Sequence, residues 1–287
     1  MLFSIIIPTC NRNEQLGKCL SLLINQVVIS DYEIIVTDDS TDDIAKQFIK
    51  KKYSFVNWVS GPKKGPAANR NNGAKHARGE WLLFLDDDII PANNLLESYY
   101  YAIRSFDGVF AFEGAIIPDN EKLLKLDMSE CPINLHGGCF WSANICIRRD
   151  VFFELDGFDE QFKFAAQEDQ DFFIRFIKKY KYEFVVKAFV IHPVRFISFR
   201  NKLFGIKKGI TNWYLLETKH NYQSIGRVLK TSIYLIYSHL RGCYKNLLSL
   251  KFKSTLFSFI WIFVGMPIYL YLVVQFSYHV KFNKKNE

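Results

Sequence analysis

Residues 81–90 read WLLFLDDDII, an apolar run that ends in three consecutive aspartates. An unbroken run of bulky apolar residues is typical of a strand that is buried on both faces of a parallel sheet. An earlier stretch, YEIIVTDDS at 32–40, has the same order of apolar strand and acidic end. Because open parallel sheets bind ligands at the carboxyl ends of their strands, we expect both acidic clusters to face one crevice.

Strand and helix patterns alternate on either side of these two stretches. Short apolar runs predict strands, and apolar residues at helical spacing predict the helices between them. Strands are predicted at 3–7, 32–37, 55–59, 81–85, 109–117, 139–147 and 182–192. Helices are predicted at 11–28, 42–50, 66–78, 92–105, 169–179, 198–222 and 224–250. This alternation predicts an α/β fold with a parallel sheet in its first part.

The composition limits which partners the protein can bind and in which cellular compartment it works. The net charge of +8 suits an anionic partner such as nucleic acid, anionic lipid or a phosphorylated substrate. No nucleic-acid recognition motif is present, so we expect no nucleic-acid partner. The six cysteines form no C-x-x-C pair, and the apolar run before Pro8 is too short for a signal peptide. We therefore expect reduced thiols and a catalytic part that stays in the cytosol.

The C-terminal part has a different composition. Residues 254–280 contain no Asp, Glu, Lys or Arg, and this run exceeds the roughly 20 residues that a helix needs to cross a bilayer. We predict a transmembrane or re-entrant membrane segment at 255–280, the latter bent at 265–267; a buried or an interfacial helix is the alternative. Lysines on both sides leave its orientation open. The predicted parts are a catalytic domain at 1–222, a basic amphipathic helical segment at 223–254 and the membrane segment.

The three aspartates at 86–88 are candidates for a metal site. Adjacent carboxylates repel one another, and a hard cation such as Mg²⁺ or Mn²⁺ offsets that repulsion while leaving room for substrate phosphates. In an extended segment Asp86 and Asp88 point to one side and Asp87 to the other. We expect Asp88 to hold the metal and one of the first two to contact ribose. The alternative is a solvated turn or a cap of the next helix.

Two further segments offer groups for a nucleotide. Asp38 or Asp39 can accept a hydrogen bond from the N3–H of uracil, although capping of the next helix explains an aspartate there equally well. A helix that starts at Gly65-Pro66 directs its N-terminus toward phosphate, and Arg70 on it can bind an anion with its forked guanidinium. A surface amphipathic helix is the alternative for this segment.

Acidic residues also open the segment EDQDFFIRF at 168–176. Acids in a first helical turn are stabilised by the helix dipole, which is the structural explanation for Glu168, Asp169 and Asp171. A carboxylate in that position is also suited to act as a general base toward an attacking hydroxyl. His192 ends the last predicted strand; such a histidine is either structural or a further metal ligand beside the carboxylates.

Taken together, these segments resemble the family-2 glycosyltransferases, which have the GT-A fold, a Rossmann-like mixed sheet. The resemblance covers about residues 1–195, in the family's order and spacing. The matching stretches are SIIIPTCNR (4–12), EIIVTDDSTDD (33–43), GPAANRNNGAKHARGEWLLFLDDDI (65–89), GGCFWSANICIRRDVFFELDGFDEQF (137–162) and QEDQDFFIRF (167–176).

The resemblance implies a role for each candidate residue. Asp169 looks like the catalytic base, and Asp86 and Asp88 look like the DXD pair, with Asp88 on Mn²⁺ or Mg²⁺. His192 is similar to a histidine that some members use as a further metal ligand. The nucleotide-sugar donor would contact Pro8, Thr9, Arg12, Asp38, Asp39, Arg70, Asp86, Asp87, Trp141 and Glu168. Gly137-Gly138 would line the acceptor and sugar pocket together with Trp141.

Three departures from the family pattern affect these roles. The glycine that often follows the first acidic pair is missing, because Asp39 runs directly into Ser40, and this can shift the base contact by one residue. The family's Gly-Gly-Phe-Asp reads DGFD at 156–159. Its Ala-Arg-Asn reads Asn69-Arg70-Asn71, which keeps the arginine.

The resemblance implies an inverting, metal-dependent glycosyltransferase of bacterial type at the cytoplasmic face of the cell membrane. The expected donor is a UDP-sugar, and the expected acceptor is a lipid-linked or surface-polysaccharide glycan. A nucleotidyltransferase that makes a nucleotide sugar is the enzymatic alternative, but the early Gly-rich loop and lysine that it needs are missing. A non-catalytic, membrane-anchored binding module is the second alternative. A Rossmann dehydrogenase would require a G-x-G-x-x-G motif, which is not present.

Overall fold

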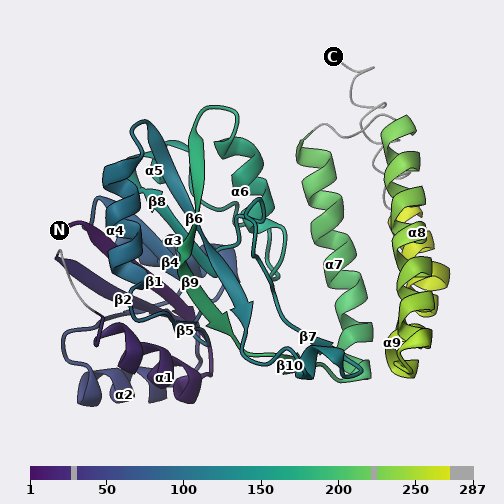
Figure 1. The fold of residues 1–287 in the computed structure, drawn as a ribbon, viewed down its shortest axis with the longest axis horizontal. Helices are drawn as coiled ribbons and strands as arrows, with labels where there is room; N and C mark the ends of the chain where they lie inside the picture. Colours follow the sequence, from purple (N-terminus) through teal and green to yellow (C-terminus); the bar gives the residue numbers. More distant parts are fainter. Residues whose placement is uncertain (27–30, 221–224, 272–287) are drawn as a thin grey trace. The chain divides into compact units, whose positions relative to one another are not determined.

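The computed structural model describes residues 1–26, 31–220 and 225–271. It has two compact units (Figure 1). The first, which we call the sheet unit, comprises Met1–Asp119 and Cys131–Pro193. The second, the helical unit, comprises Asn120–Glu130 and Val194–Glu287.

The sheet unit contains an eight-stranded mixed sheet in the order β3-β2-β1-β4-β8-β6-β9-β5. Its strands are β1 Phe3–Thr9, β2 Tyr32–Asp38, β3 Asn57–Ser60, β4 Trp81–Leu85, β5 Ile90–Pro91, β6 Val109–Pro118, β8 Asn144–Arg148 and β9 Lys181–His192. Strands β3, β2, β1 and β4 are parallel, as predicted from the alternating first part. Strand β8 runs antiparallel to β4 and β6, so the second half of the sheet is mixed.

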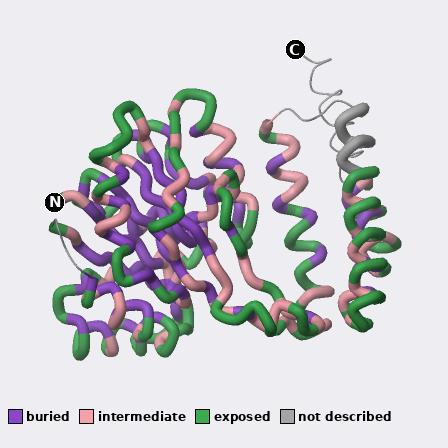
Figure 2. The backbone as a smooth tube through the Cα atoms, viewed as in Figure 1, coloured by how far each residue is buried: buried purple, intermediate pink, exposed green. Residues whose placement is uncertain are grey.

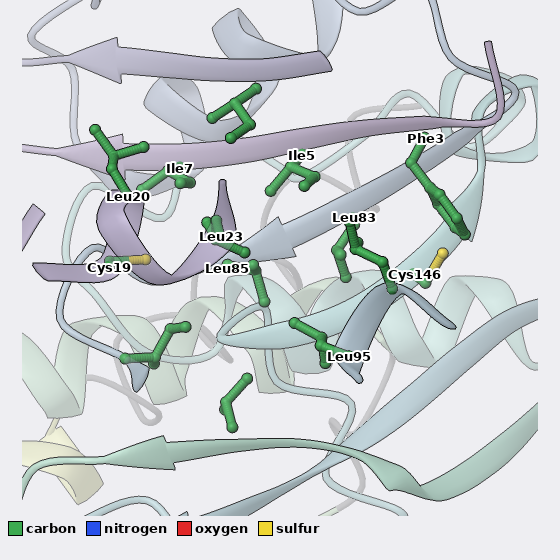
Figure 3. Close-up of a cluster of buried hydrophobic side chains, with 14 of the residues drawn as sticks. Phe3, Ile5, Ile7, Cys19, Leu20, Leu23, Leu83, Leu85, Leu95 and Cys146 are labelled. Carbon is green, nitrogen blue, oxygen red and sulfur yellow. The ribbon is translucent and has the colours of Figure 1, made fainter. Parts of the chain in front are cut away.

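One face of this sheet is covered by helices α1 Asn13–Leu23, α2 Ile44–Lys52 and α4 Leu95–Ser105. Because successive strand residues point to opposite faces, Ile5 and Ile7 of β1 pack on this side. They belong to one cluster with Leu20 and Leu23 of α1 (Figure 3). Leu95 of α4 is part of the same cluster. These side chains are fully buried, which makes this layer the larger of the two apolar cores of the sheet unit.

The opposite face is covered by helices α3 Pro66–Lys75, α5 Arg149–Glu154 and α6 Glu168–Phe176. Here the alternate strand residues, such as Ile6 and Phe84, pack against a cluster of phenylalanines. Helix α3 lies close to β1, because a Cβ on Gly73 would come within 2.5 Å of Ile6. This close approach positions Arg70, which is on the same helix, beside the strand ends.

Several predicted boundaries were wrong. The strand expected at 139–147 begins only at Asn144, because the backbone before it is folded into a turn with Phe140 in the left-handed region (φ 51°). The helix expected at 66–78 ends at Lys75, and the one expected at 11–28 starts at Asn13 and ends at Leu23. The short strand β5 was not predicted at all, since two residues carry no periodicity.

The helical unit consists mainly of α7 Phe199–Lys219, α8 Ile225–Leu248 and α9 Phe252–Ile260, followed by a π-helical turn, Trp261–Gly265. A short 3₁₀ turn, Leu123–Lys125, and the paired strands β7 Ser129–Glu130 and β10 Arg195–Phe196 complete it. Asp127 accepts hydrogen bonds from the backbone N–H groups of Lys253 (2.9 Å) and Ser254 (3.1 Å). It therefore caps the N-terminus of α9 from far away in the sequence.

Among the described residues, one helix, Phe252–Tyr271, is long and apolar enough to cross a membrane. The residues at 265–267 are helical, and whether the segment spans or re-enters a membrane stays a prediction. Proline lacks a backbone N–H and clashes with the preceding turn, and the π-helical turn just before Pro267 is where the backbone adjusts to it. Residues 272–280 of the predicted membrane segment lie outside the described residues.

Large apolar residues of α8 and α9 are exposed. Figure 2 shows how much of the backbone of these helices belongs to exposed residues. On α9 and its continuation they recur at helical spacing, at Phe252, Leu256, Phe259 and Phe263. Surfaces of this kind mark protein or membrane contacts.

Candidate active site

The carboxyl ends of β1, β2 and β4 meet at one edge of the sheet, because these strands are parallel neighbours. Thr9 at the end of β1 is paired in register with Asp38 at the end of β2, and Asp86 directly follows β4. The two acidic clusters therefore lie at the same edge, as the sequence predicted.

The first acidic pair divides into two different environments. Asp38 is buried; one of its oxygens accepts a hydrogen bond from the Ser40 N–H (2.9 Å), and the other accepts one from Trp58 Nε1 (3.2 Å). Asp39 is half-buried and accepts a hydrogen bond from the Lys63 N–H (2.8 Å). Burial raises the pKa of Asp39 against the effect of that bond. Asp38 thus orders the turn, and Asp39 is the more accessible carboxylate of the pair.

The three aspartates after β4 point in different directions. Asp87 faces β1: it accepts hydrogen bonds from Thr9 Oγ1 (2.7 Å) and from Arg12 Nη1 (3.1 Å). Burial raises its pKa to about 6, although Arg12 and Thr9 both act to lower it. Arg12 Nη1 also lies 3.4 Å from Asp88, so this one guanidinium bridges two of the three carboxylates.

Arg70 on α3 compensates the negative charge of Asp86, the first of the three aspartates. Its Nη2 lies 2.9 Å from Asp86, and its Nη1 lies 3.1 Å from Glu168 at the start of α6. Burial opposes a charge on Arg70, but the nearby carboxylates, above all Asp86 and Glu168, raise the pKa of the guanidinium. A buried arginine held by two acids is a fixed positive charge that faces the strand ends.

Asp86, Asp88 and His192 form a candidate metal site. One ligand atom from each lies within 4.8 Å of the others, and among the described residues no other group of three meets this criterion. His192 Nε2 is 3.5 Å from Asp88 Oδ1. The two residues meet because β5 pairs with β9, with Ile90 opposite Ile191.

The protonation of His192 fits a cation at this point. Its Nδ1 lies 3.0 Å from the carbonyl oxygen of Pro193, which can only accept a hydrogen bond. In the tautomer that donates from Nδ1 to this carbonyl, Nε2 presents its lone pair toward Asp88. Two carboxylates and one imidazole are suitable ligands for Mn²⁺ or Mg²⁺, and a cation between them would replace the repulsion of facing lone pairs by attraction.

The two acids at the start of α6, Glu168 and Asp169, have different partners. Asp169 Oδ2 accepts hydrogen bonds from the Ser142 N–H (3.0 Å) and from Ser142 Oγ (3.2 Å). Glu168 is buried; burial and the nearby Asp169 raise its pKa to about 7, against the opposing effect of Arg70. Ala166 and Gln167 precede it with φ angles of 108° and 76°, and such left-handed backbone is common at functional sites.

Glu113 on β6 is a site residue that the sequence analysis missed. It is buried, and its carboxylate accepts hydrogen bonds from Asn134 Nδ2 (2.7 Å) and from the backbone N–H groups of Gly138 (2.7 Å), Cys139 (2.9 Å) and Phe140. These bonds fold the Gly137-Gly138 turn that leads to Trp141 and Ser142. A lone glutamate within an apolar strand was the available signal, since such a residue must find partners inside.

Asn71 on α3 was also missed. Its side chain donates to the carbonyl oxygen of Phe158 (2.7 Å) and accepts from the N–H of the same residue (2.9 Å). The preceding Gly157 has a φ of 62°, and a Cβ there would lie 2.7 Å from the Asn71 oxygen. The DGFD stretch is therefore a turn fastened to α3, which orders the chain ahead of α6.

Most of the predicted site residues are thus connected. Thr9, Arg12 and Asp87 form one hydrogen-bonded group, and Asp86, Arg70 and Glu168 form a second. The remaining predicted residues lie nearby in the sheet unit: Pro8 is half-buried on β1 next to Thr9, and Trp141 is half-buried against the larger core. These residues lie at the carboxyl ends of the parallel strands, where open α/β sheets bind nucleotides and other ligands.

Comparison with known proteins identifies the family. The model of "Glycosyl transferase family 2" matches residues 4–170, and that of "Glycosyltransferase like family 2" matches residues 139–234. The chain belongs to glycosyltransferase family 2, as the resemblance in the sequence predicted.

Curated relatives support this assignment. The chain is 43% identical over 113 residues to the poly(ribitol-phosphate) beta-glucosyltransferase of Bacillus spizizenii, an alignment of 36% of this chain and 17% of that one. It is 41% identical over 93 residues to the GalNAc(5)-diNAcBac-PP-undecaprenol beta-1,3-glucosyltransferase of Campylobacter jejuni, with 30% and 29% covered. An uncharacterized glycosyltransferase of Haemophilus influenzae is 24% identical over 229 residues, with 74% and 73% covered. The chain thus spans less than a third of the length of the first two.

Solved structures confirm the GT-A fold. TarS of S. aureus superimposes with a TM-score of 0.58 at 21% identity, over 76% of this chain and 39% of that one. The mannosyltransferase PcManGT from Pyrobaculum calidifontis, in complex with GDP-Man and Mn²⁺, gives a TM-score of 0.56 at 16% identity, over 95% and 73%.

We predict that Glu113→Gln weakens both the fold and the site. Glutamine keeps one acceptor oxygen, but its NH₂ group meets backbone N–H donors that then have no acceptor. Leaving one buried donor unsatisfied costs roughly 1–3 kcal/mol. Urea unfolding should show that loss, and transfer assays should show a lower kcat, because the turn that supports Ser142 and Asp169 loosens. Glu183→Gln is the matched control, because Glu183 is an exposed glutamate on the neighbouring strand β9. It should change neither the stability nor the kcat. Wild-type stability and kcat in Glu113→Gln would contradict the role of Glu113.

We predict a pH dependence of stability that comes from Glu168. Its pKa in the folded protein, about 7, lies above the ordinary 4.5, so the folded state binds more protons between these values. The free energy of unfolding therefore falls as pH rises from about 4.5 to about 7, by on the order of 3 kcal/mol for this group. Urea unfolding of the chelator-treated protein across this range should be less pH-dependent in Glu168→Gln than in wild type. Parallel pH curves for the two proteins would show that Glu168 titrates normally.

Proposed function

We propose that this protein is a metal-dependent, inverting glycosyltransferase that transfers a sugar from a UDP-sugar to an acceptor hydroxyl. The observation that carries the proposal is the cluster of Asp86, Asp88 and His192 beside the buried Arg70. It brings metal ligands and a fixed cation to the sheet edge at which this fold binds nucleotides.

In this proposal Asp86, Asp88 and His192 would hold Mn²⁺ or Mg²⁺, which when bound would screen the charge of the donor diphosphate. Arg70 stabilises the negative charge that grows on the leaving diphosphate, because its own charge is fixed and buried. Arg12 and Thr9 hold Asp87 away from that charge, and Asp39 is the better placed of the first pair to contact a nucleobase, since both oxygens of Asp38 are engaged in the turn.

Asp169 acts as the general base. Both hydrogen bonds from Ser142 end on Oδ2, so Oδ1 is the oxygen that we assign to the acceptor. The acceptor hydroxyl gives its proton to Asp169 as its oxygen forms a bond to the anomeric carbon. The bond from that carbon to the diphosphate oxygen breaks with its electron pair, and UDP leaves. A single displacement of this kind inverts the anomeric configuration.

Glu168 and Trp141 complete the donor and acceptor pocket in this assignment, together with Pro8 and the Gly137-Gly138 turn. We assign catalysis to residues 1–222 and membrane attachment to residues 255–280. Residues 223–254 are the basic amphipathic helical segment between them. The exposed apolar helix Phe252–Tyr271 supports attachment, and we place the enzyme at the cytoplasmic membrane face. A lipid-linked or surface-polysaccharide glycan as acceptor is supported by relatives named for poly(ribitol-phosphate) and undecaprenol-linked substrates.

The test is release of nucleoside diphosphate by the purified full chain from UDP-glucose, UDP-N-acetylglucosamine or GDP-mannose, with Mn²⁺ or Mg²⁺. We expect UDP from one UDP-sugar, and a loss of about 10²–10⁴-fold in Asp169→Asn, since that is what a general base contributes. Asp169→Asn should still bind the donor, whereas Asp88→Asn should lose metal-dependent donor binding. Asp107→Asn, at an exposed aspartate before β6, is the matched control.

Three results would contradict the proposal. Release of pyrophosphate rather than UDP would indicate a nucleotidyltransferase. Full turnover by Asp169→Asn would remove the assigned base. A product that keeps the anomeric configuration of the donor, read by NMR, would exclude single displacement.

A further inference from the structure

The helical unit contains a cavity of about 430 Å³, within the size range of small-ligand sites. Residues of α7, α8 and the Phe252–Tyr271 helix line it. Most of the lining side chains are apolar or aromatic: Ile206, Ile210, Trp213, Leu235, Phe257 and Trp261. Water gains few hydrogen bonds in such a space, so an apolar ligand is favoured over solvent.

Two glycines of α7 open the cavity on one side. Gly205 and Gly209 are one helical turn apart, so they share a face of α7, and both line the cavity. A Cβ built on either would meet no heavy atom within 4 Å. Glycine within a helix costs about 1 kcal/mol relative to alanine. Neither glycine is required by close packing; both are exposed and leave space at the open side of the cavity.

A polar group inside the cavity lacks a partner. Tyr269 lines the cavity and is 1% exposed, and its buried hydroxyl has no hydrogen-bond partner within the part of the chain that the structure describes. Buried hydroxyl groups are nearly always paired, because leaving one unpaired costs free energy. This hydroxyl is therefore available to a ligand that carries a hydrogen-bonding group.

Basic groups line the same cavity. Lys202 lies over the ring of Phe257, 5.1 Å from its centroid, and no ion pair of Lys202 occurs in the described part of the chain. His239 stacks on Trp261 with 4.1 Å between ring centroids. The exposed Glu130 also lines the cavity, so an anionic group is placed at Lys202 and His239. Apolar walls with this lysine and histidine suit an apolar chain that ends in an anionic group.

We propose that this cavity binds the apolar chain of a single-chain lipid phosphate, with the phosphate near Lys202 and His239. Two features favour a lipid over a soluble ligand. The Phe252–Tyr271 helix that forms one wall is apolar enough to lie in a bilayer, so a lipid can enter from the side. The volume suits one chain better than the two of a phospholipid. Identifying this lipid as the carrier of the acceptor rests on the proposed function.

Photolabelling tests the proposal on the full chain in phosphatidylcholine vesicles. The probe is dodecyl phosphate with a diazirine in its chain, and labelled peptides are mapped by mass spectrometry. We expect labels on the peptides with Trp213, Phe257 or Trp261, removed by excess dodecyl phosphate and not by inorganic phosphate. Gly209→Leu fills the cavity and should reduce labelling about tenfold, equivalent to about 1.4 kcal/mol. Leucine is a better helix former than glycine, so α7 should still form.

Gly209→Ala is the matched control, because a single methyl group leaves most of the space, and it should label like wild type. Lys202→Gln should weaken labelling by the phosphate probe and leave labelling by diazirine-bearing dodecanol unchanged. Labels spread over the exposed side chains of α8 and α9, unaffected by Gly209→Leu, would mean general lipid contact and would overturn the proposal. Equal labelling of the wild type by the phosphate probe and the dodecanol probe would show that the cavity does not recognise the phosphate.

Failure of this site and failure of the proposed function are separable. Labelling needs no turnover, so Asp169→Asn should label normally while it releases no UDP. Specific labelling in a protein that never releases UDP would leave a lipid site without the glycosyltransferase activity. UDP release without specific labelling would leave the enzyme and remove the lipid site.

Discussion

The compensation of three adjacent negative charges at the end of β4 is the constraint on which the site depends. Asp87 is paired with Arg12 and Thr9 from the β1 end, and Asp86 is paired with Arg70 from α3. Asp88 lies 3.4 Å from Arg12 Nη1 and 3.5 Å from His192 Nε2. The three carboxylates thus depend on partners from several elements, and Arg12 serves two of them. The parallel strand ends, α3 and the β5–β9 pair must all form before the charges are balanced.

Burial makes this balance energetically important. The carboxyl groups of Asp87 and Glu168 have raised pKa values, of about 6 and about 7, because they are removed from water. Arg70 keeps its charge in the same surroundings because two acids face it. An uncompensated charge here would be costly, so the arginine and the acids have to be placed together.

The parts of this arrangement that follow local rules could be predicted from the sequence. Apolar runs and helical spacing identified β1, β2 and β4, and the rule for strand ends in parallel sheets brought Asp38 and Asp86 to one edge. The contacts made by distant segments could not be predicted in this way. Glu113 reaches the Gly137-Gly138 turn across the sheet, and β5 is too short to have a period, yet it joins Asp88 to His192.

The helical unit shows the same limit. Its apolar composition was evident, and the long helix Phe252–Tyr271 agrees with it. The cap that Asp127 provides for α9 and the cavity behind Gly205 and Gly209 come from packing between helices, which no single stretch encodes. We therefore propose two distinct roles for the described C-terminal helices, contact with a bilayer and binding of one lipid chain.

The most direct measurement of the central claim is Mn²⁺ binding by the purified protein in the presence and absence of UDP, followed by electron paramagnetic resonance. With one ion held by Asp86, Asp88 and His192, we expect one bound Mn²⁺ per chain, and tighter binding with UDP. In His192→Gln binding should weaken by at least about 10–100-fold, which is the range seen when only a group that orients a ligand is lost. Binding that is unchanged in both His192→Gln and Asp88→Asn would contradict the claim that these residues share one cation.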